Sequence, residues 1–293
     1  MKITIRLAFS FLSISIFLSP LTYGQTVPFS AGRIIISSDG NEHDEDDWAA
    51  TPLSLALLAA NGLQDRVVVY SFSDHTWGSN KEKPSAAAQM RESAFIGAKM
   101  FGFKKTKLIE AVTAPNYAII EITTQINESS AKDPLTLIAA GPMEVIGNSL
   151  NEADSTKLKY VRLISHSTWN DEHAEKPYEW ETHKGWTWEK IKESFGSKGL
   201  QMDHILDQNG GEGYEGLKAK KSAYDWIKTS PKKDAKPFEK GSWDWLYSRL
   251  EAAQKGDEFD PSDAGMIIYL LTGKQKTNPE DVKAMLENPQ KFK

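Results

Sequence analysis

Short runs of apolar residues alternate with longer helical stretches along most of the chain. The runs that are rich in β-branched residues are predicted strands, and they lie at residues 33–37, 66–71, 107–112, 134–142 and 160–167. Helical periodicity and end signals predict helices at residues 49–61, 86–102, 117–127, 143–152, 188–195, 223–229, 243–253, 263–271 and 279–286. Buried strands separated by helices predict an α/β fold with an open, mostly parallel sheet and helices on both faces.

The pattern changes after Ser167. Residues 168–215 are dense in Trp, Tyr and His and poor in periodicity. They predict an irregular, Trp-rich rim of long loops with a short helix near its middle. No break in composition is sharp enough to separate a second fold. We therefore expect one α/β domain over residues 25–293.

The first 24 residues differ from the rest of the chain. Lys2 and Arg6 precede an apolar run over residues 7–18, and a small residue, Gly24, stands at a plausible cleavage point. This arrangement predicts a signal peptide over residues 1–24, with an uncleaved anchor as the alternative. The run is shorter than the roughly 20 residues of a membrane-spanning helix. We expect a secreted or periplasmic protein with no membrane span after cleavage.

Composition and charge exclude several kinds of chemistry. The chain has no cysteine, which excludes disulfides, thiolate metal sites and thiol nucleophiles. Its formal net charge is −5 and becomes −7 once Lys2 and Arg6 are removed. An acidic surface argues against nucleic acid as a partner.

Acids are concentrated in the loop that follows the first strand, at residues 39–47. In an open parallel sheet, ligands bind beyond the carboxyl ends of the strands. The other segments expected at that edge are residues 73–75, 141–144 and 166–167. A solvated loop with acids at a helix start explains only Asp46 and Asp47. A hard cation such as calcium, which prefers oxygen ligands, is the second explanation. Phosphoryl transfer with magnesium is the third, although no glycine-rich phosphate cradle is present.

Several segments, in order, resemble the nucleoside hydrolase superfamily. Asp39 at a strand end, followed by Asp46-Asp47 at a helix start, is similar to the family's amino-terminal acidic signature. "PLTLIAAGPMEVIGNSL" resembles its strand–Gly-Pro–helix segment, and "DPSDAGMIIYLLTG" resembles the late Asp that opens a helix. "LDQN" lies where the family carries a sugar-binding Asn. The resemblance covers most of residues 33–273 and indicates a divergent, secreted branch of the nucleoside hydrolase-like fold.

This resemblance implies a Ca²⁺-dependent enzyme that hydrolyses a glycosidic bond, N-ribosyl or another glycoside, with a metal-bound water. Asp39 would bind the metal and take a proton from that water. The metal ligands expected on this basis are Asp39, Asp44, Asp47, Glu144 and Asp263. The substrate contacts expected are Asn41, Asp46, Asp74, His75, Trp169 and Asn209.

Histidines and tryptophans add candidates at the same edge. His43, His75 and His166 fall at predicted strand ends, where a His is suited to acid catalysis near neutral pH. We expect His43 and His166 to be catalytic, and the alternative is a hydrogen-bonded structural role. A zinc site lacks the usual spacing of its His ligands. Trp169 would stack on a sugar ring or pack the loops against the sheet.

Other classes of protein are compatible with these residues. One is a non-catalytic carbohydrate-binding protein on the same scaffold, and another is a metal-dependent phosphoesterase. The set Asp39, Asp46, Asp47 and Asp263 favours a hydrolase, because binding alone does not require it. The expected partner is a small sugar or nucleoside, with export favouring a glycan unit. A homo-oligomer is expected by analogy with the family.

Overall fold

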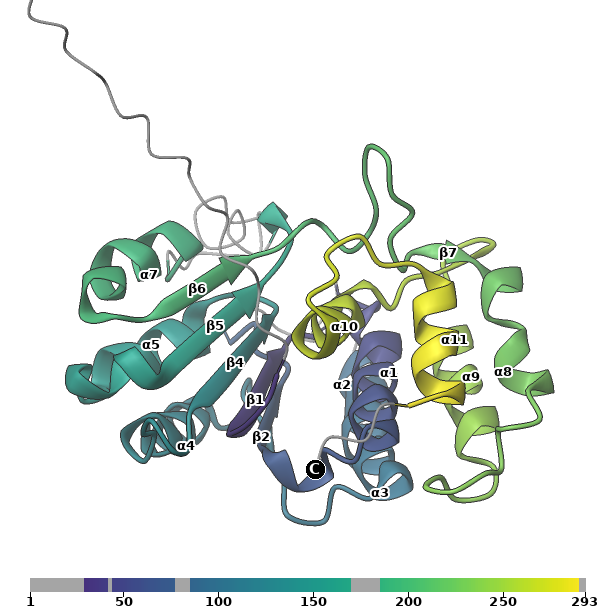
Figure 1. Ribbon diagram of the computed structural model, residues 1–293, viewed down its shortest axis with the longest axis horizontal. Helices are drawn as coiled ribbons and strands as arrows, with labels where there is room; N and C mark the ends of the chain where they lie inside the picture. Colours follow the sequence, from purple (N-terminus) through teal and green to yellow (C-terminus); the bar gives the residue numbers. More distant parts are fainter. Residues whose placement is uncertain (1–28, 42–43, 77–84, 170–184, 290–293) are drawn as a thin grey trace, which may run out of the picture.

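The computed structural model describes residues 29–41, 44–76, 85–169 and 185–289. A six-stranded sheet lies at its centre, in the order β3-β2-β1-β4-β5-β6, and all neighbouring strands are parallel (Figure 1). The strands are β1 (Arg33–Ser38), β2 (Val67–Phe72), β3 (Lys107–Glu110), β4 (Leu135–Ala140), β5 (Val161–Ser165) and β6 (Gln201–His204). The predicted α/β class and parallel sheet are confirmed.

Helices cover both faces of this sheet (Figure 1). The helices on the first face are α1 (Asp47–Ala60), α2 (Ser85–Arg91), α3 (Gly97–Phe101), α8 (Trp226–Thr229), α9 (Ser242–Ala252), α10 (Gly265–Thr272) and α11 (Pro279–Glu287). Of these, α9 and α11 pack against α1, and α8 packs against α9, on the far side of α1 from the sheet (Figure 1). The second face is covered by α4 (Pro115–Asn127), α5 (Glu144–Glu152) and α7 (Trp188–Phe195). In the part of the chain that the structure describes, no helix combines the length and apolarity needed to cross a bilayer.

The strand residues explain why both faces are covered. Ile34 and Ile36 belong to the core beneath α1, whereas Ile35 belongs to the core beneath α4 and α5. Successive side chains of a strand point to opposite faces, so a continuous run of isoleucines makes both faces apolar. All three side chains are buried, as expected for a parallel sheet between two helical layers.

The structure differs from the sequence-based prediction in the rim. Within residues 168–215, the predicted helix is present as α7, but residues 201–204 form β6, a sixth strand at the edge of the sheet. Its sequence, Gln-Met-Asp-His, is polar and partly exposed, because an edge strand pairs on one side only. Hydrophobic periodicity therefore did not predict it. A small antiparallel pair, β7 (Ala219–Lys220) and β8 (Glu258–Phe259), lies outside the main sheet.

The direction of winding reverses between β1 and β4. The connections from β1 to β3 run through helices of the first face, and those from β3 to β6 run through helices of the second face. Such a reversal opens a crevice beyond the carboxyl ends of the two central strands. There the amide of Asp39 donates to the carbonyl of Ala140, with an N···O distance of 3.1 Å.

Gly141 makes this close approach of the two strand ends sterically allowed. A Cβ atom at this position would lie 2.8 Å from the amide nitrogen of Asp39 and 3.1 Å from its Cβ. The glycine therefore permits the first acid of the loop to sit against the end of β4.

We expect Gly141→Ala to lower the free energy of unfolding by about 1–3 kcal/mol, the usual penalty for overpacking. The matched control is Gly196→Ala, because nothing lies within 4 Å of a Cβ at that position. Urea denaturation of both variants measures the difference. Equal stabilities would contradict the steric role assigned to Gly141.

Candidate functional site

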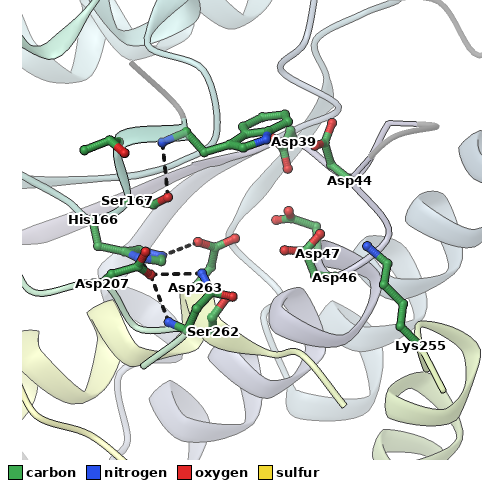
Figure 2. Close-up of a pocket in the computed structure, with 13 residues that line it drawn as sticks. Asp39, Asp44, Asp46, Asp47, His166, Ser167, Asp207, Lys255, Ser262 and Asp263 are labelled. Atoms are coloured by element: carbon green, nitrogen blue, oxygen red, sulfur yellow. Dashed lines mark hydrogen bonds and ion pairs between the residues drawn. The ribbon is translucent and has the colours of Figure 1, made fainter. Parts of the chain in front are cut away.

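A cavity of about 410 Å³ opens at the crevice between the central strands. Its lining residues are Asp39, Asp44, Asp46, Asp47, His166, Ser167, Thr168, Trp169, Asp207, Asn209, Lys255, Ser262 and Asp263 (Figure 2). They come from the loops after β1, β5 and β6, from the start of α1, from the connection between α9 and β8, and from the segment that leads into α10. The acids predicted from the sequence thus meet residues far from them in the chain.

Five carboxylates converge on one side of this cavity (Figure 2). Asp39, Asp44 and Asp47 are buried, with 3%, 5% and 2% of their surface exposed. Oxygens of Asp46, Asp47 and Asp263 lie within 4.8 Å of one another. Asp46 and Asp47 stand at the start of α1, where the helix dipole favours negative charge. That preference does not offset the repulsion within a cluster of this size.

The pKa values of three of these carboxyl groups reflect this crowding. Burial, followed by the charge of Asp44, raises the pKa of Asp39 well above its usual value. Burial, followed by the charge of Asp263, raises the pKa of Asp46 to about 8. Burial, followed by the charge of Asp39, raises the pKa of Asp47 well above its usual value. Without a compensating positive charge, the cluster therefore retains protons at neutral pH.

The residues present fit a hard divalent cation. Among the residues that the structure describes, Oδ1 of Asp47 has no hydrogen-bond partner although it is buried. A buried carboxylate oxygen without a donor is unfavourable, and a cation would supply the missing partner. The cluster offers carboxylate oxygens, which calcium and magnesium prefer. Lys255 on the cavity wall lowers the pKa of Asp46 only as a minor effect.

His166 follows β5 and contacts the acidic cluster through Asp263. Its Nε2 lies 2.5 Å from Oδ1 of Asp263, and its Nδ1 lies 3.4 Å from Oδ1 of Asp207. In the neutral ring, Nδ1 can instead accept from the amide of Gln208, at 3.1 Å. Burial alone would lower the pKa of His166, but hydrogen bonds to Asp207 and Asp263 outweigh it and raise the pKa to about 9. In either charge state, the Nε2 proton faces Asp263.

Three residues predicted to contact substrate lie outside the cavity lining. Asn41, Asp74 and His75 are exposed over only 2%, 0% and 1% of their surface, and none of them lines the cavity. The side chain of Asn41 accepts from the amide of His75 at 3.3 Å. Asp74 accepts from the hydroxyl of Ser71 at 2.7 Å, and Nδ1 of His75 lies 3.7 Å from Oδ2 of Asp44. These contacts connect the acidic loop to the segment that follows β2.

Glu144, predicted as a metal ligand, is also placed elsewhere. Its carboxylate accepts from Nδ2 of Asn148 at 2.8 Å and from the amide of Trp186 at 2.9 Å. It is the first residue of α5, where a negative charge is favourable, and it does not line the cavity. His43, predicted to be catalytic, lies outside the described residues, as does the predicted signal peptide.

Two charged residues of the cavity were missed by the sequence reasoning. Asp207 accepts from the amide and the side chain of Asn209, at 3.0 and 2.9 Å. It follows β6, the strand that was not predicted, so its place at the sheet edge was not recognised. His166 is the leading cause that lowers the pKa of Asp207. Lys255 comes from the connection between α9 and β8, and no local pattern marked it.

Trp169 and Asn209, which the sequence suggests as substrate contacts, lie on the cavity wall. The amide of Trp169 donates to the hydroxyl of Ser167 at 3.2 Å. Ser167 has a φ of 67°, in the left-handed region that a residue with a side chain seldom adopts. This turn directs the chain after β5 along the cavity wall.

Known proteins that are similar to this chain include a solved structure and a bacterial protein. No family model matches the chain. Among solved structures, an inosine-uridine preferring nucleoside hydrolase from Bacillus anthracis is similar, with a TM-score of 0.45 and 12% identity over 83% of this chain and 82% of that chain. The uncharacterized protein P22 of Formosa agariphila is 32% identical over 253 residues, which cover 83% of this chain and 84% of that protein. The chain belongs to the same family as protein P22 of Formosa agariphila.

Proposed function

We propose that the protein is a hydrolase that cleaves a glycosidic bond with the help of calcium. The observation that carries this proposal is the convergence of Asp39, Asp46, Asp47 and Asp263 in one cavity. The same residues stand in the motifs that resemble nucleoside hydrolases. Asp46, Asp47 and Asp263 would hold the cation, because their oxygens lie within 4.8 Å of one another. When bound, the cation supplies positive charge that offsets the carboxylates and increases the acidity of nearby water.

Asp39 is the residue best placed to act as a base. It is buried and lines the cavity, and once a cation compensates the cluster its carboxylate is ionised and can accept a proton from water. The other carboxylates have a second task. Hydrolysis of a glycosidic bond passes through a transition state with positive charge on the sugar ring, and preorganised negative groups stabilise that charge.

The contacts of His166 favour an orienting role over protonation of a leaving group. Both ring nitrogens are already engaged, Nε2 by Asp263 and Nδ1 by Asp207 in the charged ring or by the amide of Gln208 in the neutral ring. A ring held in this way fixes the position of the Asp263 carboxylate. Its function would therefore be to keep a metal ligand in place, as groups around metal ligands commonly do.

The cavity volume of about 410 Å³ suits a small molecule. We propose a sugar unit or a nucleoside as the substrate, with the ring stacked near Trp169 and its hydroxyls bonded to Asn209. We also propose that the protein is exported through its amino-terminal segment, which favours a glycan-derived substrate.

Removing one ligand tests the cation site. We expect Asp47→Asn to raise the Kd for calcium on the order of 100-fold, because loss of charge and geometry weakens a site built from carboxylates. Isothermal titration calorimetry measures the change. Asp65→Asn is the control, since Asp65 is exposed and pairs with Lys105 at 2.7 Å, away from the cavity lining. An unchanged Kd in Asp47→Asn would place the cation elsewhere.

Stability should depend on pH in a defined direction. Because the pKa values of Asp39, Asp46 and Asp47 are raised on folding, the folded metal-free protein binds more protons than the unfolded chain above about pH 4. Its stability therefore falls as pH rises towards about 8, where Asp46 ionises. His166, with a pKa of about 9 in the folded state, contributes a loss of the same sign above its unfolded value of 6.5.

Differential scanning calorimetry at pH 5 and pH 8.5 checks this expectation. Without metal, the Tm should be lower at pH 8.5. Calcium should raise the Tm more at pH 8.5 than at pH 5, because it replaces protons in the cluster. A metal-free protein that is equally stable at both pH values would argue against the crowded, protonated site.

Activity separates a hydrolase from a binding protein. A panel of nucleosides and p-nitrophenyl glycosides should yield a released base or phenol with the wild-type protein and calcium. Asp39→Asn should lower kcat by roughly 10²–10⁴-fold, the usual contribution of a general base, with a smaller change in KM. Binding of the same sugars without any product would instead favour a carbohydrate-binding protein.

A further inference from the structure

Helix α1, which carries the acidic residues at its start, has an interruption in its hydrogen bonds. Pro52 lies inside the helix and has no N–H to donate. In a regular α-helix, that N–H would bond to the carbonyl four residues earlier, which here belongs to Trp48. Trp48 follows Asp47 directly and is 6% exposed. Its carbonyl therefore needs a donor from another part of the chain.

Ser93 supplies that donor. Its hydroxyl donates to the carbonyl of Trp48, with an O···O distance of 2.6 Å, and its side chain is fully buried. Ser93 lies in a π-helical turn, Glu92–Ile96, between α2 and α3. Such turns carry one additional residue relative to an α-helix and often occur at functional sites.

Arg249 on α9 determines the direction of this hydroxyl. Its Nε donates to Oγ of Ser93 at 3.0 Å, so the hydroxyl proton is left to point at Trp48. The guanidinium is 4% exposed and is itself held by the carbonyl of Gln89 at 3.0 Å and by Glu92 at 3.2 Å. The Ser93 hydroxyl therefore accepts from Arg249 and donates its single proton to the carbonyl of Trp48.

Trp48 continues these contacts into the acidic loop. Its indole Nε1 donates to the carbonyl of Gly40 at 3.0 Å, and the amide of Gly40 donates to Oδ1 of Asp39 at 2.8 Å. Hydrogen bonds thus connect Arg249 to Asp39 through Ser93, Trp48 and Gly40, and the covalent bonds within Trp48 and Gly40 join one hydrogen bond to the next. Asp47 is attached to the same series by the peptide bond to Trp48.

We infer that Ser93 and Arg249 are positioning residues that fix Asp47, a ligand of the proposed cation site, and Asp39, the proposed base, through the carbonyl that Pro52 leaves without a helical donor. Neither residue lines the cavity, so both act through Trp48. This inference rests on the proposed function and adds to it the groups that hold the ligands in place.

The first experiment compares Ser93→Ala with Ser93→Thr, which keeps a hydroxyl. Ser93→Ala should raise the Kd for calcium about tenfold, in the range seen when groups behind metal ligands are lost, and Ser93→Thr should restore most of the affinity. Ser149→Ala is the matched control, since Ser149 is fully buried and donates to the carbonyl of Val145 at 2.7 Å on α5, outside the cavity lining. It should lose stability and retain the Kd.

A double-mutant cycle tests the role assigned to Pro52. Pro52→Ala restores an N–H that can bond to the carbonyl of Trp48. In that background, Ser93→Ala should raise the Kd several-fold less than it does in the wild-type protein, because the carbonyl keeps a donor. Arg249→Lys, which retains the charge, gives a second route should Ser93→Ala fold poorly, and it should also raise the Kd. Equal effects of Ser93→Ala in both backgrounds would overturn the role of Pro52.

Hydrogen–deuterium exchange of the metal-free protein keeps this test separate from the proposed function. Ser93→Ala should increase exchange in peptides that cover residues 44–56 and leave peptides from α5 unchanged. A wild-type protein that binds no calcium would overturn the proposed function, while the exchange measurement still decides whether Ser93 holds the loop. Unchanged exchange at residues 44–56 in Ser93→Ala, or an unchanged Kd in a protein that binds calcium, overturns the inference.

Discussion

Repulsion among buried carboxylates is the constraint on which the rest of this structure depends. Asp39, Asp46 and Asp47 are brought together at the end of β1 with Asp263 beside them. Burial together with mutual charge raises the pKa values of Asp39, Asp46 and Asp47. In a region with little solvent, like charges at these distances are strongly unfavourable. A cluster of this kind persists only when protons or a cation compensate it. The rest of the fold has to hold the acids in place despite that repulsion.

Three features of the fold do so. The reversal of winding between β1 and β4 opens the crevice, and Gly141 lets the end of β4 approach Asp39. The start of α1 presents its amide groups and dipole to Asp46 and Asp47. The third is the set of hydrogen bonds from neighbouring elements. Asp74 and its serine partners lie under the loop, and the series through Ser93 reaches it from α9. The acidic loop is thus held in place by contacts with the sheet and with helices of the first face.

The opposite wall of the cavity is organised around His166. Its ring connects Asp207, which follows the edge strand, to Asp263, which precedes α10. One side chain thereby orders groups from three separate segments and orients a carboxylate of the cluster. Trp169 and Asn209 lie on the same wall and offer an aromatic face and an amide. The cavity therefore combines an acidic side that suits a cation with a second side that would contact the sugar ring of the substrate that we propose.

Local patterns in the sequence were sufficient for five of the six strands of the main sheet, for most of the helices and for the acidic loop. Runs such as Ile34-Ile35-Ile36 are buried on both faces wherever they occur in a parallel sheet, and a loop after such a strand reaches the carboxyl edge. The placement of Asp39, Asp46, Asp47 and Asp263 at one edge followed from that rule and from the family resemblance.

Only the tertiary structure decided which groups meet. Asp207 lines the cavity because it follows an edge strand that was too polar to be recognised, and Glu144 lies at the start of α5, away from the cavity. Asp74 and His75 are buried next to the acidic loop. The hydroxyl of Ser93 bonds to the carbonyl that Pro52 leaves without a helical donor. The physical reason is that burial and secondary structure depend on neighbours in sequence, whereas contacts between distant side chains depend on sheet order and helix packing, which no local pattern records.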